Sequence, residues 1–230
     1  MQKRVIVVIT AFMFLMAGCN TETSKNEHMK YTYLALGDSY TIGERVDENQ
    51  RFPVQLVDTL TSYEWVASDT TIVAKTGWTT DELDAGIREA ELKDSYDLVT
   101  LLIGVNNQYR GRSVENYREE FVPLLHKAIR FAGGDPAKVI VISIPDWGVT
   151  PFAEGRDRGQ IASEIDAYNT VNKEEAEAAG VKYVDVTPVS RQAAQNQHLV
   201  ASDGLHPSAE MYSLWVELLV DKARASLVKE

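Results

Sequence analysis

The chain has 230 residues, 44% of them hydrophobic and 25% charged, which suits one globular domain with a sizeable core. Its formal net charge of -11 argues against nucleic acid as a partner, because phosphate contacts require a basic surface. The four histidines are scattered, with no HExxH motif or Cys/His cluster, and no GxGxxG or GxxxxGK[ST] motif is present. We therefore expect neither a metal nor a nucleotide or other organic cofactor.

Residues 1–18 have the pattern of an export signal, because basic residues precede an apolar run too short to span a bilayer. The run ends in LMAGC, which resembles the lipobox of bacterial lipoproteins, and Cys19 would be the lipidated residue. Residues 19–30 would then be a polar tether. We expect an extracytoplasmic protein held to a bacterial membrane by a lipid on Cys19. The alternatives are cleavage elsewhere, with Cys19 a bystander, or a start at Met29, which would give a cytosolic enzyme.

Five short runs rich in Val, Ile and Leu follow, and they alternate with segments of helical spacing. The runs are mostly continuous in hydrophobicity, which is typical of strands buried on both faces of a parallel sheet. They cover residues 32–38, 70–76, 97–104, 138–145 and 181–188. Strand and helix in steady succession predict right-handed crossovers and a single three-layer α/β/α sandwich over residues 31–230.

The intervening segments predict helices over residues 52–62, 79–93, 113–132, 159–179 and 208–228. Thr79 and Glu82, three residues apart, predict a capping box at the start of the second helix. In the last helix we expect one apolar stripe made of Met211, Leu214, Trp215, Leu218 and Leu219.

Polar residues follow the predicted strands at the edge where active sites of parallel sheets lie. Ser39 follows the first strand, Gly77 the second and Asn106 the third, and the turn before the last helix contains Asp203 and His206. His206 could take the proton of Ser39 while Asp203 holds the imidazole. The backbone N–H groups of Ser39 and Gly77 and the amide of Asn106 could form an oxyanion hole. Each residue alone fits an ordinary turn, but the ordered set predicts acyl transfer by a serine nucleophile.

The blocks GDSY, Gly77, GVNN and DGLH occur in the order in which they occur in the SGNH, or GDSL, hydrolases, and the chain from residue 31 onward resembles this family of serine esterases and lipases. The resemblance implies a flavodoxin-like fold around a five-stranded parallel sheet, and ester hydrolysis through an acyl-enzyme without a cofactor. Two positions depart from the family pattern: Tyr40 stands where Leu is common, and Asn107 where Asp often follows the asparagine. We expect both to alter packing or substrate preference without removing catalysis.

Aromatic residues that follow strand ends are candidates for the pocket wall, although each could equally be a core residue. They are Trp78, Tyr109, Trp147 and Phe152. The substrate stays open among short-chain, acetyl-glycan and lysophospholipid-type esters, as does the oligomeric state. Two other functions also stay open: an O-acyltransferase that uses the same site, and a lipoprotein that binds glycan or lipid without turnover.

Overall fold

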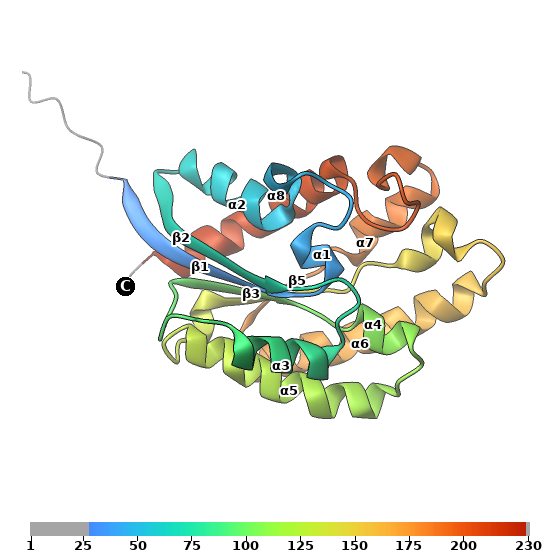
Figure 1. The fold of residues 1–230 in the computed structure, drawn as a ribbon, viewed down its shortest axis with the longest axis horizontal. Helices are drawn as coiled ribbons and strands as arrows, with labels where there is room; N and C mark the ends of the chain where they lie inside the picture. The colour runs from blue at the N-terminus through green and yellow to red at the C-terminus, as the bar shows by residue number, and fades with distance from the viewer. Residues whose placement is uncertain (1–27, 229–230) are drawn as a thin grey trace, which may run out of the picture.

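The computed structural model describes residues 28–228, which form a parallel sheet with helices on both faces (Figure 1). The strands are β1 (Met29–Gly37), β2 (Trp65–Ala74), β3 (Leu98–Leu102), β4 (Val139–Ile142) and β5 (Lys182–Val184). They lie in the order β2-β1-β3-β4-β5, and every neighbouring pair is parallel. The predicted three-layer α/β/α sandwich and its five-stranded sheet are confirmed. The proposed signal peptide and Cys19 lie outside the described residues.

The central strands are those with continuous apolar sequence. Every residue of β3 and β4 is buried, because helices cover both faces of the sheet there. β1 is paired on both sides, and its residues from Tyr33 to Gly37 are all buried. Ser39, two residues beyond this strand, is therefore attached to one of the most constrained parts of the backbone.

Several boundaries differ from the sequence expectation. The last three strands are shorter than predicted, and the run over residues 181–188 gives only β5 before helix α7 (Thr187–Ser190) begins. The helix expected over residues 79–93 ends at Glu89.

The other two differences concern the starts of β1 and β2. β1 begins at Met29, so the last two residues of the expected tether belong to the sheet. Met29 is paired with Trp65, and its N–H donates to the carbonyl of Glu64 at 2.9 Å. β2 begins at Trp65, five residues earlier than predicted, because the mixed sequence WVASD gains partners from the start of β1.

Helices α2 (Phe52–Thr61) and α8 (Ala209–Leu227) cover one face of the sheet (Figure 1). Helices α3 (Thr80–Glu89), α5 (Val114–Phe131) and α6 (Arg158–Ala178) cover the other. The predicted capping box is confirmed, since the Thr79 N–H donates to Glu82 Oε2 at 2.9 Å. No helix within residues 28–228 is long and apolar enough to cross a bilayer.

The predicted stripe of α8 is partly wrong. Met211, Trp215 and Leu219 are buried, but Leu214 is only half-buried and Leu218 is 41% exposed. The buried arc of the helix is rotated toward Tyr212, which, like Trp215, packs against Phe52 of α2. The helix buries the side that faces α2, which spacing within α8 alone does not specify.

Three short helices directly follow strands and lie near the carboxyl ends of the sheet (Figure 1). They are α1 (Ser39–Ile42), α4 (Val105–Tyr109) and α7 (Thr187–Ser190). Short 3-10 turns complete the connections: η1 (Glu48–Gln50), η2 (Pro136–Lys138), η3 (Trp147–Val149), η4 (Pro151–Ala153), η5 (Arg191–Ala194) and η6 (Gln197–Leu199). Gly37 permits the close approach of α1, because a Cβ there would collide with Thr41 and with the carbonyl of Leu102.

Candidate active site

Ser39 is the first residue of α1 and is 5% exposed. Asp38 precedes it as the N-cap, and its Oδ1 accepts a hydrogen bond from the Tyr40 N–H at 3.0 Å. Because Ser39 begins the helix, its own N–H has no carbonyl partner inside α1. The strand and the cap thus fix a serine at the start of a helical turn, with its backbone N–H free to bind a substrate.

Asp38 is fully buried, and its Oδ2 has no hydrogen-bond partner. Burial raises the pKa of this carboxyl to about 7, although the hydrogen bond from the Tyr40 N–H acts in the opposite direction. A large share of the Asp38 side chains is therefore protonated at neutral pH. Asp38, next to the nucleophile, therefore carries less negative charge on average than a fully ionised aspartate would.

Asp203 and His206 form a compact pair in the turn before α8. His206 Nδ1 lies 2.6 Å from Asp203 Oδ2, and Asp203 Oδ1 accepts the N–H groups of Leu205 and His206 at 3.0 and 3.1 Å. Partial burial acts to raise the pKa of Asp203, but the hydrogen bonds from the His206 ring and these N–H groups outweigh it and lower that pKa. An ionised Asp203 therefore holds the Nδ1 side of the imidazole, and Nε2 is left for the reaction.

The other expected oxyanion donors come from the loop after β2 and from α4. Gly77 has a φ of +86°, a left-handed conformation that favours glycine, and its carbonyl accepts from Arg110 Nη2 at 2.7 Å. Asn106 Nδ2 donates one hydrogen bond to the Trp78 carbonyl at 2.9 Å, which leaves its second N–H. Within the described residues, the backbone N–H groups of Ser39 and Gly77 have no acceptor. Three donors are thus available to a developing oxyanion.

Asn107 fastens α4 to the start of α3. Its Oδ1 accepts the Thr80 N–H at 3.1 Å, and its Nδ2 donates to Thr80 Oγ1 at 2.6 Å and to Glu120 Oε2 at 3.3 Å. The side chain is fully buried. An asparagine suits this position because it must both donate and accept, so the departure from the family pattern has a structural function beside the Gly77 loop.

Tyr40, the other departure, is the second residue of α1, and its ring packs against the histidine. Tyr40 is 3% exposed, and its ring meets the His206 ring edge-on, with centroids 5.8 Å apart. It also contacts the Trp215 ring at 6.3 Å. The sequence shows that Tyr40 is next to Ser39, but its contact with His206 could be seen only in the three-dimensional structure.

A cavity of about 200 Å³ brings the predicted residues together. Ser39, Gly77, Asn106 and His206 all line it, and Asp203 binds His206 from outside the cavity lining. Three of the four predicted wall residues are present, namely Tyr109, Trp147 and Phe152. The cavity is also lined by Thr76, Val105 and Leu205, which the sequence analysis did not identify, and by Tyr40, which it named only as a departure from the family pattern.

Trp78 does not line this cavity, so its prediction as a wall residue is wrong. Its ring packs on Gly86 of α3, where a Cβ would collide with it. The loop after β2 directs the Gly77 backbone toward the cavity and the neighbouring indole toward the helix. Elsewhere, in residues 28–228, no group of three or more His, Cys, Asp or Glu side chains is arranged to hold a metal ion.

Comparison with solved structures finds the same architecture in TesA and in two esterases. TesA superposes with a TM-score of 0.64 at 19% identity, covering 85% of this chain and 99% of TesA. Axe2, an acetylxylan esterase from Geobacillus stearothermophilus, gives a TM-score of 0.64 at 18% identity, covering 89% and 97%. The psychrotrophic esterase EstA from Pseudoalteromonas sp. gives 0.62 at 16% identity, covering 84% and 96%. At such low identity these similarities show a shared fold.

The sequence comparison is more specific. Residues 35–214 match the GDSL-like Lipase/Acylhydrolase family, whereas no curated protein matches the chain significantly. The matched segment includes Ser39 and Gly77 near its start and His206 near its end. Because the match covers well over half of the sequence, the chain belongs to the GDSL-like lipase/acylhydrolase family.

Proposed function

We propose that this protein is a serine esterase that hydrolyses small carboxylic esters through an acyl-enzyme. The observation that carries the proposal is the shared cavity, in which Ser39 lies with two further oxyanion donors and with a histidine whose Nδ1 is 2.6 Å from Asp203. Nucleophile, base, orienting carboxylate and oxyanion donors are the parts that acyl transfer requires.

In the first half-reaction, Ser39 Oγ attacks the carbonyl carbon of the ester while His206 Nε2 accepts its proton. The carbonyl oxygen becomes an oxyanion that accepts hydrogen bonds from the N–H groups of Ser39 and Gly77 and from the Asn106 amide. The bond to the alcohol oxygen then breaks, and the imidazolium returns the proton to that oxygen. The alcohol leaves, and the acyl group stays on Ser39.

In the second half-reaction, water attacks the acyl carbon and gives its proton to His206. The same donors stabilise the second oxyanion, and the bond to Ser39 Oγ breaks as the imidazolium protonates the serine. A carboxylic acid and the free enzyme result, and Asp203 stays ionised throughout. The lowered pKa of Asp203 supports this assignment.

The dimensions of the cavity favour a short acyl group. Its volume of about 200 Å³ is small beside the roughly 300–1,000 Å³ of pockets that bury larger ligands. Its aromatic lining suits an apolar acyl group such as acetyl or butyryl, whereas a palmitoyl chain would extend beyond it.

We also propose that the enzyme is exported and anchored through a lipid on Cys19. The support is in the sequence, where the apolar run of residues 1–18 ends in LMAGC. Nine residues separate Cys19 from the start of β1 at Met29, so a short tether would connect lipid and domain. Labelling with a radioactive fatty acid, compared with a Cys19→Ala variant, tests this part, and equal labelling of both proteins would refute it.

The catalytic proposal is tested with the chain from residue 20 onward, which retains the whole described domain. We expect hydrolysis of p-nitrophenyl acetate and butyrate, little hydrolysis of the palmitate, and a loss of at least about 10³-fold in Ser39→Ala. Ser95→Ala, at an exposed serine before β3, is the matched control. Equal rates in both variants would exclude Ser39 as the nucleophile, and transfer of the acyl group to an added alcohol in preference to water would identify an acyltransferase.

A further inference from the structure

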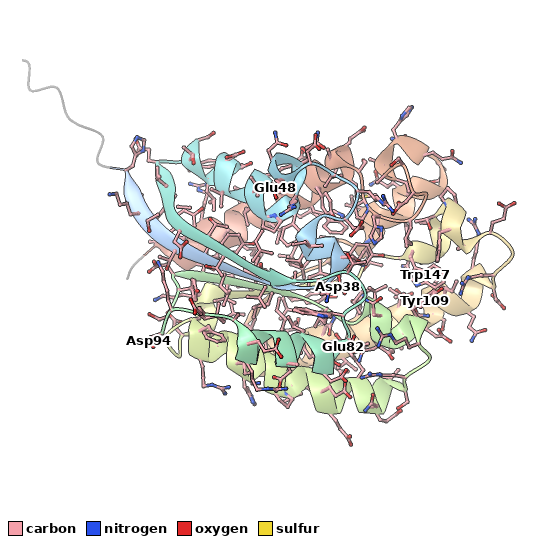
Figure 2. All side chains as sticks on the ribbon, in the orientation of Figure 1. Asp38, Glu48, Glu82, Asp94, Tyr109 and Trp147 are labelled. Carbon is pink, nitrogen blue, oxygen red and sulfur yellow. The ribbon has the colours of Figure 1, made fainter. Side chains whose placement is uncertain are left out.

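A second hollow adjoins the catalytic cavity. It has a volume of about 410 Å³, and Tyr109 and Trp147 line both spaces. We call it the polar groove and define it by Gln108, Tyr109, Trp147, Arg156, Gln160 and Glu164. Figure 2 shows Tyr109 and Trp147 near each other, to the right of Asp38. An ester bound at Ser39 therefore has a second compartment next to the one that holds its carbonyl.

A chain of hydrogen bonds fixes one side of the polar groove. Trp147 Nε1 donates to Gln108 Oε1 at 2.8 Å, and Gln108 Nε2 donates to Glu164 Oε2 at 2.6 Å. Gln160 Nε2 donates to the other oxygen, Oε1, at 2.7 Å. Gln108 is 6% exposed, so this network is built into the protein. Each Glu164 oxygen keeps lone pairs for a further donor, and the carboxylate is held in one orientation.

Arg156 lies over the aromatic wall of the same groove. The centre of its guanidinium is 5.0 Å from the Tyr109 ring, 5.3 Å from the Trp147 ring and 5.5 Å from the Phe152 ring. Its Nη2 also donates to the Tyr109 hydroxyl at 3.0 Å. Among residues 28–228 no carboxylate forms an ion pair with Arg156, whereas neighbouring Arg110 is paired with Glu82. The planar donor group is thus fixed by rings and retains free N–H groups.

We infer that the polar groove binds the alcohol part of the ester and that this alcohol is a sugar. Sugar hydroxyls both donate and accept, so they can satisfy the Glu164 carboxylate and the Arg156 guanidinium together. Tyr109 is 46% exposed, and the part of its ring that Arg156 leaves uncovered offers an apolar surface to the C–H groups of a pyranose. This inference rests on the proposed function, because a sugar there matters only if its ester carbonyl reaches Ser39.

Other occupants fit the groove less well. An alkyl chain would bury the Glu164 carboxylate and the Gln160 amide without providing hydrogen bonds to them, which is costly. An anionic headgroup would be attracted by Arg156 but would lie beside Asp157 and Glu164, which also line the space. A neutral ligand with several hydroxyls matches all three kinds of surface: carboxylate, guanidinium and aromatic ring.

The test holds the acyl group constant and varies the alcohol. Acetate release is measured from 6-O-acetylglucose, ethyl acetate and glyceryl triacetate, and kcat/KM for the sugar ester is divided by that for ethyl acetate. We expect a ratio of at least about ten in the wild type. In Arg156→Ala the ratio should fall at least about fivefold, mainly through a higher KM for the sugar ester. Arg156→Lys, which keeps the charge but loses the planar fork, should also lower it.

Arg130→Ala is the matched control, because it removes an exposed arginine from the far end of α5 and should leave the ratio unchanged. A wild-type ratio near one, a preference for glyceryl triacetate, or an equal loss on both esters in Arg156→Ala would overturn the sugar assignment. A change in the acyl-length preference of Arg156→Ala, measured with p-nitrophenyl esters, would also overturn it, since the groove would then hold the acyl chain. These results leave Ser39-dependent turnover intact, whereas its absence with every ester would overturn the proposed function itself.

Discussion

Ser39 and His206 reach one cavity from regions that are built differently. Ser39 follows β1, which is paired on both sides, and its neighbours Asp38 and Thr41 are fully buried. His206 lies in an irregular segment between η6 and α8, where the carbonyl of His206 accepts the Ala201 N–H at 2.7 Å and Asp203 binds the residues that follow it.

The difference shows which part of the structure positions Ser39 and which part positions His206. The nucleophile depends on the sheet, so changes beside it should affect folding stability as well as rate. The Asp203–His206 pair depends mainly on its own short turn, so changes there should affect rate with little effect on stability. The four predictions below test this contrast, from the largest expected effect to the smallest.

Asp203→Asn should reduce kcat by about 10³- to 10⁴-fold, because an amide cannot stabilise the imidazolium and favours the wrong tautomer of His206. Its carbonyl can still accept the N–H groups of Leu205 and His206, so the melting temperature should change little. Kinetics with p-nitrophenyl acetate and thermal unfolding measure the two effects. Asp94→Asn is the control, since Asp94 lies at the end of the molecule opposite Tyr109 and Trp147, which line the cavity (Figure 2). A large loss of stability in Asp203→Asn would contradict the idea of a self-contained turn.

Asp38→Asn should change stability in a pH-dependent way. The pKa of Asp38 is about 7 in the folded protein, above its unfolded value, so the folded state keeps this proton longer as pH rises. The stability that the protonated carboxyl contributes is fully present below about pH 4. It is lost progressively as the pH rises from about 4 to about 7. The variant should therefore gain up to about 4 kcal/mol relative to wild type between pH 4 and pH 8. Urea unfolding across this range measures it, and a constant difference would contradict the buried-carboxyl assignment.

Asn107→Asp, which restores the common family residue, should destabilise the protein by about 1–3 kcal/mol at pH 8. The new carboxylate would face Glu120 Oε2 and lose the donor to Thr80 Oγ1. Because Thr80 begins the helix that follows the Gly77 loop, kcat should fall as well, by about tenfold. Adding Glu120→Gln should recover much of both losses. Failure of this second change to help would show that charge repulsion is not the cause.

Tyr40→Leu addresses a contact that joins the two regions directly, the packing of Tyr40 against His206. Removing the ring should lower kcat by up to about tenfold through a less ordered imidazole, with little change in KM. Tyr40→Phe keeps the ring and should stay within about twofold of wild type. If Phe were as slow as Leu, the hydroxyl and not the ring would be the important group.

The sequence predicted the parts of the fold whose signals are local. Continuous apolar runs identified β3 and β4, and the spacing of Thr79 and Glu82 identified the capping box. The start of β2 was missed, because the mixed sequence WVASD becomes a strand only through pairing with β1. The short helix α4 was also missed, since five residues are too few to show a helical period.

The site was predicted in the same uneven way. Residues that lie just past strand ends could be named from order alone, and Ser39, Gly77 and Asn106 do line one cavity. The direction in which a loop side chain points could not be predicted from that order. Trp78, for example, packs on α3 instead of entering the cavity. Contacts between distant segments, such as Arg156 over Tyr109, depend on three-dimensional packing and leave no pattern in the sequence.

The direction of β1 has a consequence for how the enzyme would meet its substrates. This strand spans nine residues, roughly 30 Å. It starts where the amino-terminal ends of the strands lie, and it leads into Ser39 at the opposite, carboxyl-terminal end of the sheet. In a chain anchored through Cys19, as proposed, the attachment point and the catalytic mouth would thus lie at opposite poles of the domain. A mouth at the pole away from the attachment point would be accessible to dissolved esters and to esters carried on neighbouring polymers.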